Sequence, residues 1–400
     1  MIVLILTGFI AVFLTYLSKS PQNRSYFKWA FSLITFVSCI HYDFGSDYMA
    51  YFEMWEMISR VSFDNLYNVF YINEYEPGWV LLNKLFGFNG GFFVLVIVIS
   101  IFQNYVYYRL IKENVHPRWR WVAVYIYLFT YNFYPLSMSM LRQSLAISIF
   151  VYAICIIVNL RRRSMMSKLP SAKHIMINNH STLLAQTNFK NILISLLLIL
   201  VAASIHKSSL VLLIPYTILL LLPQKRTKLY VLLMVVFTIV MFIHKDRLFG
   251  MMEVFSEIES FSKYQGYIKE SDDLSRSFIG LIIFMIQLMP YFVLSYILWL
   301  RSREISTKNK IFFYMFFFSL LFIPIQEIGI SMISRMALYF SIFGVVVIPN
   351  IFNLINSKLY KQLFVYSYCL ALLADLYAWT KIPWVSESFT TFHTIFQVIF

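Results

Sequence analysis

The stretch Asn191–Leu222 reads NILISLLLILVAASIHKSSLVLLIPYTILLLL, two apolar runs separated only by a short polar tip, His206-Lys207-Ser208-Ser209. Each run has roughly fifteen residues, a length that approaches the hydrocarbon thickness of a membrane when it is helical. Because a segment in lipid must satisfy its backbone hydrogen bonds internally, the runs predict a helical hairpin. Its short legs place the tip below the membrane surface, where it faces protein rather than lipid.

The composition extends this prediction to the whole chain. Its 400 residues are 60% apolar, 19% aromatic and only 13% charged, which indicates an integral membrane protein rather than a soluble domain. We predict an all-α polytopic fold, one membrane domain over residues 1–400 with about twelve spans. The predicted spans cover residues 2–17, 27–41, 91–111, 121–135, 140–160, 191–205, 208–222, 229–243, 277–298, 311–326, 335–349 and 362–379. Residues 384–400 could add a thirteenth, tilted span or form a surface helix.

Basic residues are distributed unevenly between the two sides of these spans. One set of connections holds most of the 33 lysines and arginines but only two acidic residues, Glu113 and Glu304. By the positive-inside rule these connections are cytoplasmic and the N-terminus lies outside. The set comprises residues 18–28, 112–120 with Arg109, 161–190, 223–228, 300–310 and 350–361. The net charge of +14 is thus explained by topology, and it predicts no nucleic-acid partner.

The connections also limit the chemistry. The longest basic one, residues 161–190, has no glycine-rich phosphate loop and no apolar periodicity, so no nucleotide-binding domain is predicted there. The chain has no Asp-x-Asp metal motif, and its three cysteines lie inside apolar runs, as is typical of small buried hydrophobes. We predict no metal and no cofactor, and a donor that arrives already activated. The external connection 244–276 is expected to be a solvated cover.

The external loop 42–91 is rich in carboxylates and aromatic rings. Its start, HYDFGSDYMAY from His41 to Tyr51, places Asp43 and Asp47 beside the first turn of a helix expected to begin near Gly45. The helix dipole favours a carboxylate at that position, although an ordinary acidic N-cap would give the same pattern.

Two helices are predicted in this loop. A stripe at helical spacing predicts a helix that lies on the membrane surface; it comprises Tyr48, Tyr51, Phe52, Trp55 and Ile58. The sequence Glu76-Pro77-Gly78-Trp79 predicts the start of a second helix. Sugars pack on rings and bond to carboxylates, so Asp43, Tyr48, Tyr51 and Trp79 are sugar-binding candidates. An interfacial aromatic belt is the alternative explanation of the rings.

Three cations, Arg142, Lys207 and Arg335, are predicted at one depth near the outer boundary of the membrane. Arg335 opens a span that ends near Asn350, roughly 22 Å of helix, whereas the hydrocarbon layer is roughly 30 Å thick. A submerged arginine is costly unless it faces a wet or anionic cavity, although snorkelling to the surface is the alternative.

These groups favour glycosyl transfer from a lipid pyrophosphate. Arginine forks can neutralise a pyrophosphate and stabilise it as a leaving group, so Arg142, Arg335 and Lys207 are the pyrophosphate-binding candidates. A carboxylate or an imidazole can accept the proton of the attacking hydroxyl. The candidate catalytic bases are Asp47, Glu76 and His206, in that order.

Five short motifs, in this order and spacing, resemble the EpsG-like group of Wzy-type polysaccharide polymerases. The resemblance extends from about Asp43 to Phe340, and the residues after Phe340 are expected to carry no part of it. The motifs are Gly45-Ser46-Asp47-Tyr48 with Tyr51, Glu76-Pro77-Gly78, Leu141-Arg142-Gln143-Ser144-Leu145-Ala146, Ile205-His206-Lys207-Ser208-Ser209 and Ser334-Arg335-Met336 with Tyr339-Phe340.

The resemblance implies a metal-independent, inverting polymerase with a GT-C-like architecture. Such an enzyme moves a growing glycan from undecaprenyl pyrophosphate onto a second lipid-linked repeat unit, in O-antigen, capsule or exopolysaccharide synthesis. It implies an active site on the external face of the bacterial cytoplasmic (inner) membrane, and a chain-length regulator and a flippase as partners. It adds Gln143 and Tyr339 to the sugar-binding candidates.

Two other functions fit the same composition. A flippase for the lipid-linked sugar would also need buried cations, but the halves of the chain show no internal repeat and the spans contain few helix-breaking glycines or prolines. A non-catalytic scaffold in polysaccharide assembly is the third alternative.

Overall fold

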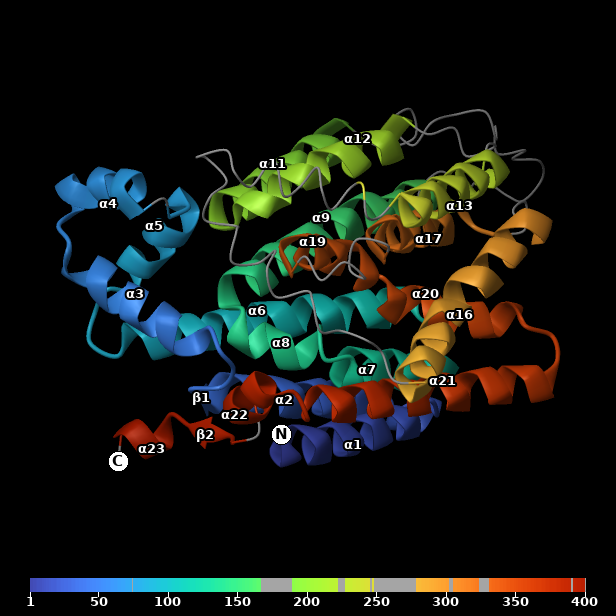
Figure 1. The fold of residues 1–400 in the computed structure, drawn as a ribbon, viewed down its shortest axis with the longest axis horizontal. Helices are drawn as coiled ribbons and strands as arrows, with labels where there is room; N and C mark the ends of the chain where they lie inside the picture. Colours follow the sequence, from blue (N-terminus) through green and yellow to red (C-terminus); the bar gives the residue numbers. More distant parts are fainter. Residues whose placement is uncertain are drawn as a thin grey trace. The chain divides into compact units, whose positions relative to one another are not determined.

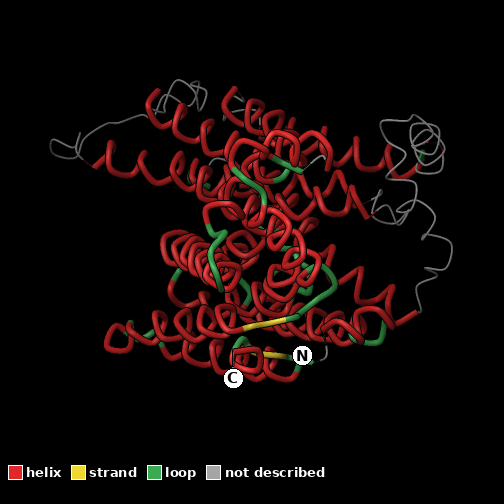
Figure 2. Tube along the Cα trace, turned by 90° about the vertical axis from the view of Figure 1, so that its left-hand side faces the viewer, coloured by secondary structure: helices red, strands yellow, loops and turns green. Residues whose placement is uncertain are grey.

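The computed structural model describes residues 1–73, 75–166, 189–221, 227–244, 247, 278–301, 305–323, 331–389 and 391–399. These residues are almost entirely helical, and Figure 2 shows one short pair of strands among them. The all-α prediction is confirmed. The predicted loops 161–190 and 244–276 lie largely outside the described residues.

The chain divides into two compact units, and each is described by itself. Unit 1 comprises Met1–Leu160, Phe189–Leu213 and Lys358–Phe400, and unit 2 comprises the described parts of Arg161–Asn188 and Ile214–Ser357. The single membrane domain over residues 1–400 stays a prediction.

Four helices from the first third of the chain pack together in unit 1. Helix α1 lies against α2 and α7, and α2 lies against α6 (Figure 1). Their bounds are α1 Ile2–Leu17, α2 Ser25–Ile40, α6 Gly91–Asn114 and α7 Arg120–Phe129. Inside the packing, Asn104 Nδ2 donates to Ser38 Oγ at 3.2 Å, and Tyr134 Oη donates to the Ile34 carbonyl at 2.9 Å. Hydrogen bonds of this kind join helices that have apolar surroundings.

The rest of unit 1 comprises elements from the middle and the end of the chain. Strand β1 pairs antiparallel with β2, with His41 opposite Thr394. The residues from 383 onward thus form two short helices and a strand rather than one continuous thirteenth span. The elements are β1 His41–Tyr42, α8 Tyr134–Ser139, α9 Leu141–Met166, α11 Phe189–Ile205, the 3-10 helix η4 Lys207–Leu212, α21 Lys358–Trp379, α22 Pro383–Phe389, β2 His393–Thr394 and α23 Phe396–Ile399.

The external loop forms a small helical layer with its own apolar core. It contains α3 (Tyr48–Arg60), the 3-10 helix η2 (Phe63–Asn65), α4 (Leu66–Asn73) and α5 (Pro77–Leu85). Its core joins these helices and consists of Ile58, Leu66, Val69 and Val80. The predicted helix start at Pro77 is confirmed, whereas the helix expected near Gly45 begins three residues later, at Tyr48.

The aromatic stripe of α3, for which the sequence predicts a place on the membrane surface, packs against protein. Its Tyr48, Tyr51 and Ile58 are buried in the protein. The ring centroids of Tyr48 and Phe52 lie 5.4 and 5.2 Å from the ring centroid of Phe92 in α6. The ring centroid of Tyr51 lies 5.5 Å from that of Trp79 in α5. The helical spacing of these residues correctly predicts an apolar face of α3, and that face packs on α5 and α6.

Unit 2 is a second helical bundle. In it α13 packs on α16, and α17 packs on α19 and α20. The elements are α12 Leu213–Leu221, α13 Thr227–Ile243, α16 Phe278–Arg301, α17 Thr307–Phe318, the 3-10 helix η8 Ser319–Phe322, α19 Ser331–Ser341 and α20 Gly344–Leu354. Arg335 does not open a straight span, since α19 begins four residues earlier and Arg335–Ser341 and Gly344–Leu354 meet at 41°. The depth predicted for Arg335 assumed a straight helix and is not supported.

Each of the twelve predicted apolar segments contains a described helix. Three described helices, α6, the Leu141–Val158 part of α9 and the Ile282–Arg301 part of α16, are long and apolar enough to cross a membrane. The bent pair makes a fourth if it is one span, and several other apolar helices have 10–17 residues. The chain thus has the character of a membrane protein with several spans.

Candidate functional site

A glycine sets the close approach on which the site depends. Gly78 lies in the first turn of α5, and a Cβ atom there would be 2.3 Å from Ser204 Oγ and 2.8 Å from the Ser204 carbonyl oxygen. Any larger residue would push the start of α5 away from the end of α11. Glu76, at the N-cap of α5, is thereby held beside the polar tip that follows α11.

Glu76 is the centre of the resulting cluster. Its Oε2 accepts from Arg142 Nη1 at 2.6 Å, and its Oε1 accepts from the Lys207 backbone amide at 3.2 Å. His206 Nδ1 lies 3.7 Å from Oε1, longer than a hydrogen bond. The Glu76 side chain is only 8% exposed, so these contacts take the place of its hydration.

The charge state of Glu76 follows from this environment. Burial by itself would raise the pKa of Glu76, but the nearby His206 ring, the Arg142 charge and the Lys207 amide outweigh burial and lower it from 4.5 to about 2. The carboxylate is therefore ionised at neutral pH, and it is a weak proton acceptor.

Arg142 is held at the break between α8 and α9. Its guanidinium carbon lies 5.9 Å from the centroid of the Tyr51 ring, within the range of a cation–π contact. Its Nε is buried and has no hydrogen-bond partner within the described part of the chain. A buried guanidinium donor with no acceptor is costly in a folded protein, so this atom marks a place for an added acceptor. We call Glu76, Arg142, His206, Lys207 and Tyr51 the Glu76–Arg142 cluster.

The loop that carries Asp47 is anchored near the same helix break. The Asp47 amide donates to Ser139 Oγ at 3.2 Å, three residues before Arg142. The Gly45 amide donates to the Ser388 carbonyl at 2.8 Å, and Gly45 has φ of +89°, a conformation that a side chain would strain. Asp47 is the N-cap of α3, and Tyr51 follows it by one helical turn, so both lie on one face of the helix.

The other sequence-predicted sugar contacts of unit 1 are mostly enclosed. Tyr48 and Trp79 have no exposed surface; Tyr48 Oη donates to the His41 carbonyl at 3.3 Å, and Trp79 Nε1 donates to the sulfur of Met54 at 3.1 Å. Gln143 is buried, whereas Asp43 is exposed and has φ of 45°. The enclosed side chains support the fold here, and contact with sugar stays a prediction for them.

Arg335 and Tyr339 belong to unit 2, on α19. Arg335 is half-buried and Tyr339 is 1% exposed. The structure thus brings together five of the predicted site residues of unit 1, namely Glu76, Arg142, His206, Lys207 and Tyr51. A joint role of Arg142 and Arg335 stays a prediction.

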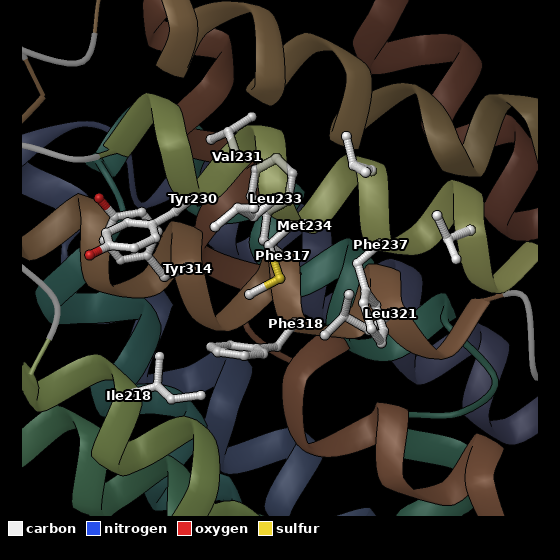
Figure 3. A pocket seen from close by; sticks show the side chains of 12 residues that line it. Ile218, Tyr230, Val231, Leu233, Met234, Phe237, Tyr314, Phe317, Phe318 and Leu321 are labelled. Carbon is white, nitrogen blue, oxygen red and sulfur yellow. The ribbon is translucent and has the colours of Figure 1, made fainter.

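Unit 2 also contains an apolar cavity of about 540 Å³ between α12, α13, α17 and η8. Figure 3 shows aliphatic and aromatic side chains around it, with the Tyr230 and Tyr314 rings side by side at one end. No charged residue is among the described side chains that line it. Such a cavity can take a hydrocarbon chain but no ionic group.

Sequence reasoning missed the residues that support the site. Ser204, Ser139 and Ser388 position it through contacts that are distant in sequence. Only Gly78 gave a signal, because a glycine just inside a helix start often marks a close approach. Within the described ranges, no group of three or more histidines, cysteines or carboxylates could hold a metal ion.

Comparison with known proteins identifies a family for this chain. A family model described as the EpsG family matches residues 24–169 and 182–388. Neither a curated protein nor a solved structure gave a match. The family match continues well beyond Phe340, so the expectation that the later residues carry no part of the resemblance was wrong. It includes the segment whose Ser388 carbonyl holds Gly45.

Proposed function

We propose a specific reaction for this chain, which belongs to the EpsG family: it joins lipid-linked oligosaccharide repeat units by inverting glycosyl transfer. Family membership and the apolar helices indicate a membrane-bound polysaccharide polymerase in the general sense. The donor that we propose is a glycan on undecaprenyl pyrophosphate, and the acceptor is a second lipid-linked repeat unit. The products belong to O-antigen, capsule or exopolysaccharide.

The observation that carries the proposal is the buried Arg142 Nε beside an ion pair that fixes the guanidinium. Glu76 accepts a hydrogen bond from Nη1 and so orients the Arg142 guanidinium, whereas Nε has no acceptor among the described residues. A phosphate oxygen is an acceptor of suitable charge, and an arginine fork binds phosphate in a directed way. The exposed Lys207 side chain, from the tip beside Glu76, adds a second positive charge.

The reaction needs charge stabilisation at the leaving group. The acceptor hydroxyl oxygen forms a bond to the anomeric carbon of the donor as the bond from that carbon to the pyrophosphate oxygen breaks. The lipid pyrophosphate leaves with the electron pair, and the hydroxyl proton passes to a base. We propose that Arg142, Lys207 and Arg335 stabilise the negative charge of the leaving pyrophosphate. Their positive charges would replace the divalent metal ion that other enzymes use for this purpose.

The base is best assigned to Asp47. Glu76 is committed to Arg142, and its pKa of about 2 makes it a poor proton acceptor. Asp47 is half-exposed, lies at the N-cap of α3, and shares a helix face with Tyr51, which contacts Arg142. His206 is the remaining candidate, and we propose that it positions Glu76 or donates a hydrogen bond to phosphate.

The proposed setting is the bacterial cytoplasmic membrane. Twelve spans with the N-terminus outside would leave loop 42–91, and so the cluster, on the external face, where lipid-linked repeat units are joined. The family resemblance implies two partners, a flippase that supplies the substrate and a chain-length regulator. The apolar cavity of unit 2 is of a kind that suits a lipid chain.

Reconstituted polymerisation tests the proposal. Purified protein in liposomes would receive a synthetic undecaprenyl pyrophosphate-linked repeat unit without nucleotide, in parallel arms with and without a chelator. We expect a ladder of products that differ by one repeat unit in both arms. No ladder, together with movement of the lipid-linked sugar across the bilayer, would establish a flippase instead. A ladder only with a divalent ion would refute the assignment of leaving-group charge to the three cations.

A further inference from the structure

Six cations of unit 1 surround a single open cavity of about 1040 Å³. They lie in two segments of the chain, from the end of α1 to the first turn of α2 and from the last turn of α6 to the start of α7. They are Lys19, Arg24, Lys28, Lys112, Arg118 and Arg120. The positive-inside rule explains the side on which such residues occur, but it does not require them to meet around one cavity.

Arg120 gives this cavity a fixed wall. Its Nη2 donates to the Lys112 carbonyl at 2.8 Å, and its Nε to the Val115 carbonyl at 3.4 Å, so it joins the end of α6 to the start of α7. Its guanidinium carbon lies 5.3 Å from the Phe27 ring centroid. The guanidinium is therefore held in place before any ligand arrives.

Within the part of the chain that the structure describes, these charges have no acidic counterpart. None of the six cations forms an ion pair with a carboxylate that the structure describes, and no described carboxylate lines the cavity. The nearest acid in sequence, Glu113, pairs instead with Arg109 at 2.9 Å. Like charges gathered in this way repel one another, and an anion placed among them would relieve the repulsion.

Two aromatic rings, Phe27 and Tyr108, line the cavity beside the cations. Phe27 and Tyr108 stack with centroids 5.2 Å apart, and Lys112 Nζ lies 5.1 Å from the Tyr108 centroid. A ligand that combines phosphate charge with an apolar part would match both the cations and the rings.

We propose that this basic cavity, defined by the six cations, binds a phosphate-bearing anion. The headgroup of an anionic phospholipid and a soluble phosphate compound are two sources of the same chemistry. Basic cavities between the ends of membrane helices are suited to headgroups with more than one phosphate. The site is separate from the Glu76–Arg142 cluster, and it does not depend on the proposed polymerase activity.

Binding to defined probes tests the proposal. The full chain would be placed in nanodiscs of phosphatidylcholine alone, with phosphatidylglycerol, or with cardiolipin, and inorganic pyrophosphate would be titrated in neutral detergent. The variant R24Q/K28Q/R118Q removes three charges from the cavity. The control K228Q/K358Q/K361Q removes three from other connections that are predicted to be cytoplasmic.

We expect saturable binding that the cavity variant weakens on the order of 100-fold and the control leaves nearly unchanged. Retention of cardiolipin would identify a lipid headgroup, and retention of pyrophosphate alone would identify a soluble anion. The variant Ser25→Trp, which keeps every charge but fills the cavity, should also lose binding, and it covers the case in which the triple variant fails to fold. Equal losses in the control, or no saturable binding of any probe, would overturn the proposal.

Discussion

Two positively charged regions of unit 1 differ in how their charges are compensated. In the Glu76–Arg142 cluster a carboxylate contacts a guanidinium at 2.6 Å, and the side chains are 8% and 21% exposed. In the basic cavity six cations share an open space without a described carboxylate partner. The first region has one acid that fixes one cation, whereas the second has only cations.

The difference indicates two ways to bind an anion. Glu76 holds the Arg142 fork in one orientation, which suits the directed contacts that a reacting phosphate needs. The basic cavity provides a positive field with exposed lysines, which suits retention of a headgroup without chemistry. Removal of a cation should therefore have opposite effects on the stability of the two regions.

The largest effect is expected for Arg142. In Arg142→Ala the leaving group loses its oriented fork, so the rate of polymerisation should fall about 100-fold or more. Arg142→Lys should recover little, because a point charge lacks the fork. The measurement is polymer formed by equal amounts of membrane-inserted protein. Arg109→Ala is the matched control, since Arg109 forms a part-buried pair with Glu113 outside the cluster; an equal loss there would remove the special role of Arg142.

The next effect concerns stability. Glu76→Gln leaves the Arg142 charge in a nearly buried site without its counterion, so the free energy of unfolding should fall by about 2 kcal/mol. Glu113→Gln, in a pair whose side chains are 32% and 30% exposed, should cost less than about 1 kcal/mol. Thermal unfolding in detergent would compare them. Similar losses would mean that the cluster is no more than a surface ion pair.

The same pair predicts a pH dependence. The pKa of Glu76 is lowered from 4.5 to about 2, so the unfolded chain binds its proton more readily than the folded chain. The stabilisation from Glu76 is fully present above pH 4.5 and is lost as the pH falls toward about 2. The stability difference between wild type and Glu76→Gln should thus be constant near neutrality and shrink only in acid. A difference that varies around neutral pH would show that another group titrates in the cluster.

A smaller effect is expected at the glycine that brings the cluster together. Gly78→Ala places a methyl group against the Ser204 backbone, at a cost of about 1 kcal/mol or more, and should also reduce polymerisation because Glu76 shifts. In Gly8→Ala the nearest atoms to the added methyl group belong to the far end of the Phe129 side chain, at 2.9 Å, and not to backbone, so the cost should be smaller. Unfolding and polymer assays of both variants would check this. Equal tolerance of the two changes would argue against a required close approach of α5 and α11.

The smallest expected change has the opposite sign. Without an anion, Arg24→Gln should relieve repulsion in the basic cavity and stabilise the protein by less than about 0.5 kcal/mol at low salt. High salt should abolish this gain, because exposed charges are screened. Thermal unfolding in neutral detergent at two salt concentrations would measure it. A loss of stability at low salt would mean that Arg24 has a structural partner.

The sequence predicted the helical class well, because apolar runs and the demands of a backbone in lipid leave little choice. It also named Glu76, Arg142, His206 and Lys207, since charged residues among apolar helices are conspicuous. It did not reveal that Glu76 pairs with Arg142, because that contact depends on Gly78 meeting Ser204 across more than a hundred residues. Nor did it reveal the role of the tail, whose Ser388 carbonyl holds Gly45 by a backbone contact that has no side-chain signature.

Two features of the packing could not be predicted from the sequence, for physical reasons. An apolar helical stripe looks the same whether it faces lipid or protein, so the burial of Tyr48 and Tyr51 could not be read from spacing. The basic connections were explained by topology alone, because charge counts contain no information about which loops meet. The basic cavity became visible only when the connections before α2 and before α7 were placed side by side.

In the proposed reaction the Arg142 fork, oriented by Glu76, holds the pyrophosphate of the lipid donor. The most direct measurement is equilibrium binding of undecaprenyl pyrophosphate without sugar to wild type, Arg142→Ala and Arg109→Ala in phosphatidylcholine nanodiscs. We predict binding that weakens at least about 30-fold in Arg142→Ala and is unchanged in Arg109→Ala. Equal affinity of all three proteins for the lipid pyrophosphate would contradict the claim.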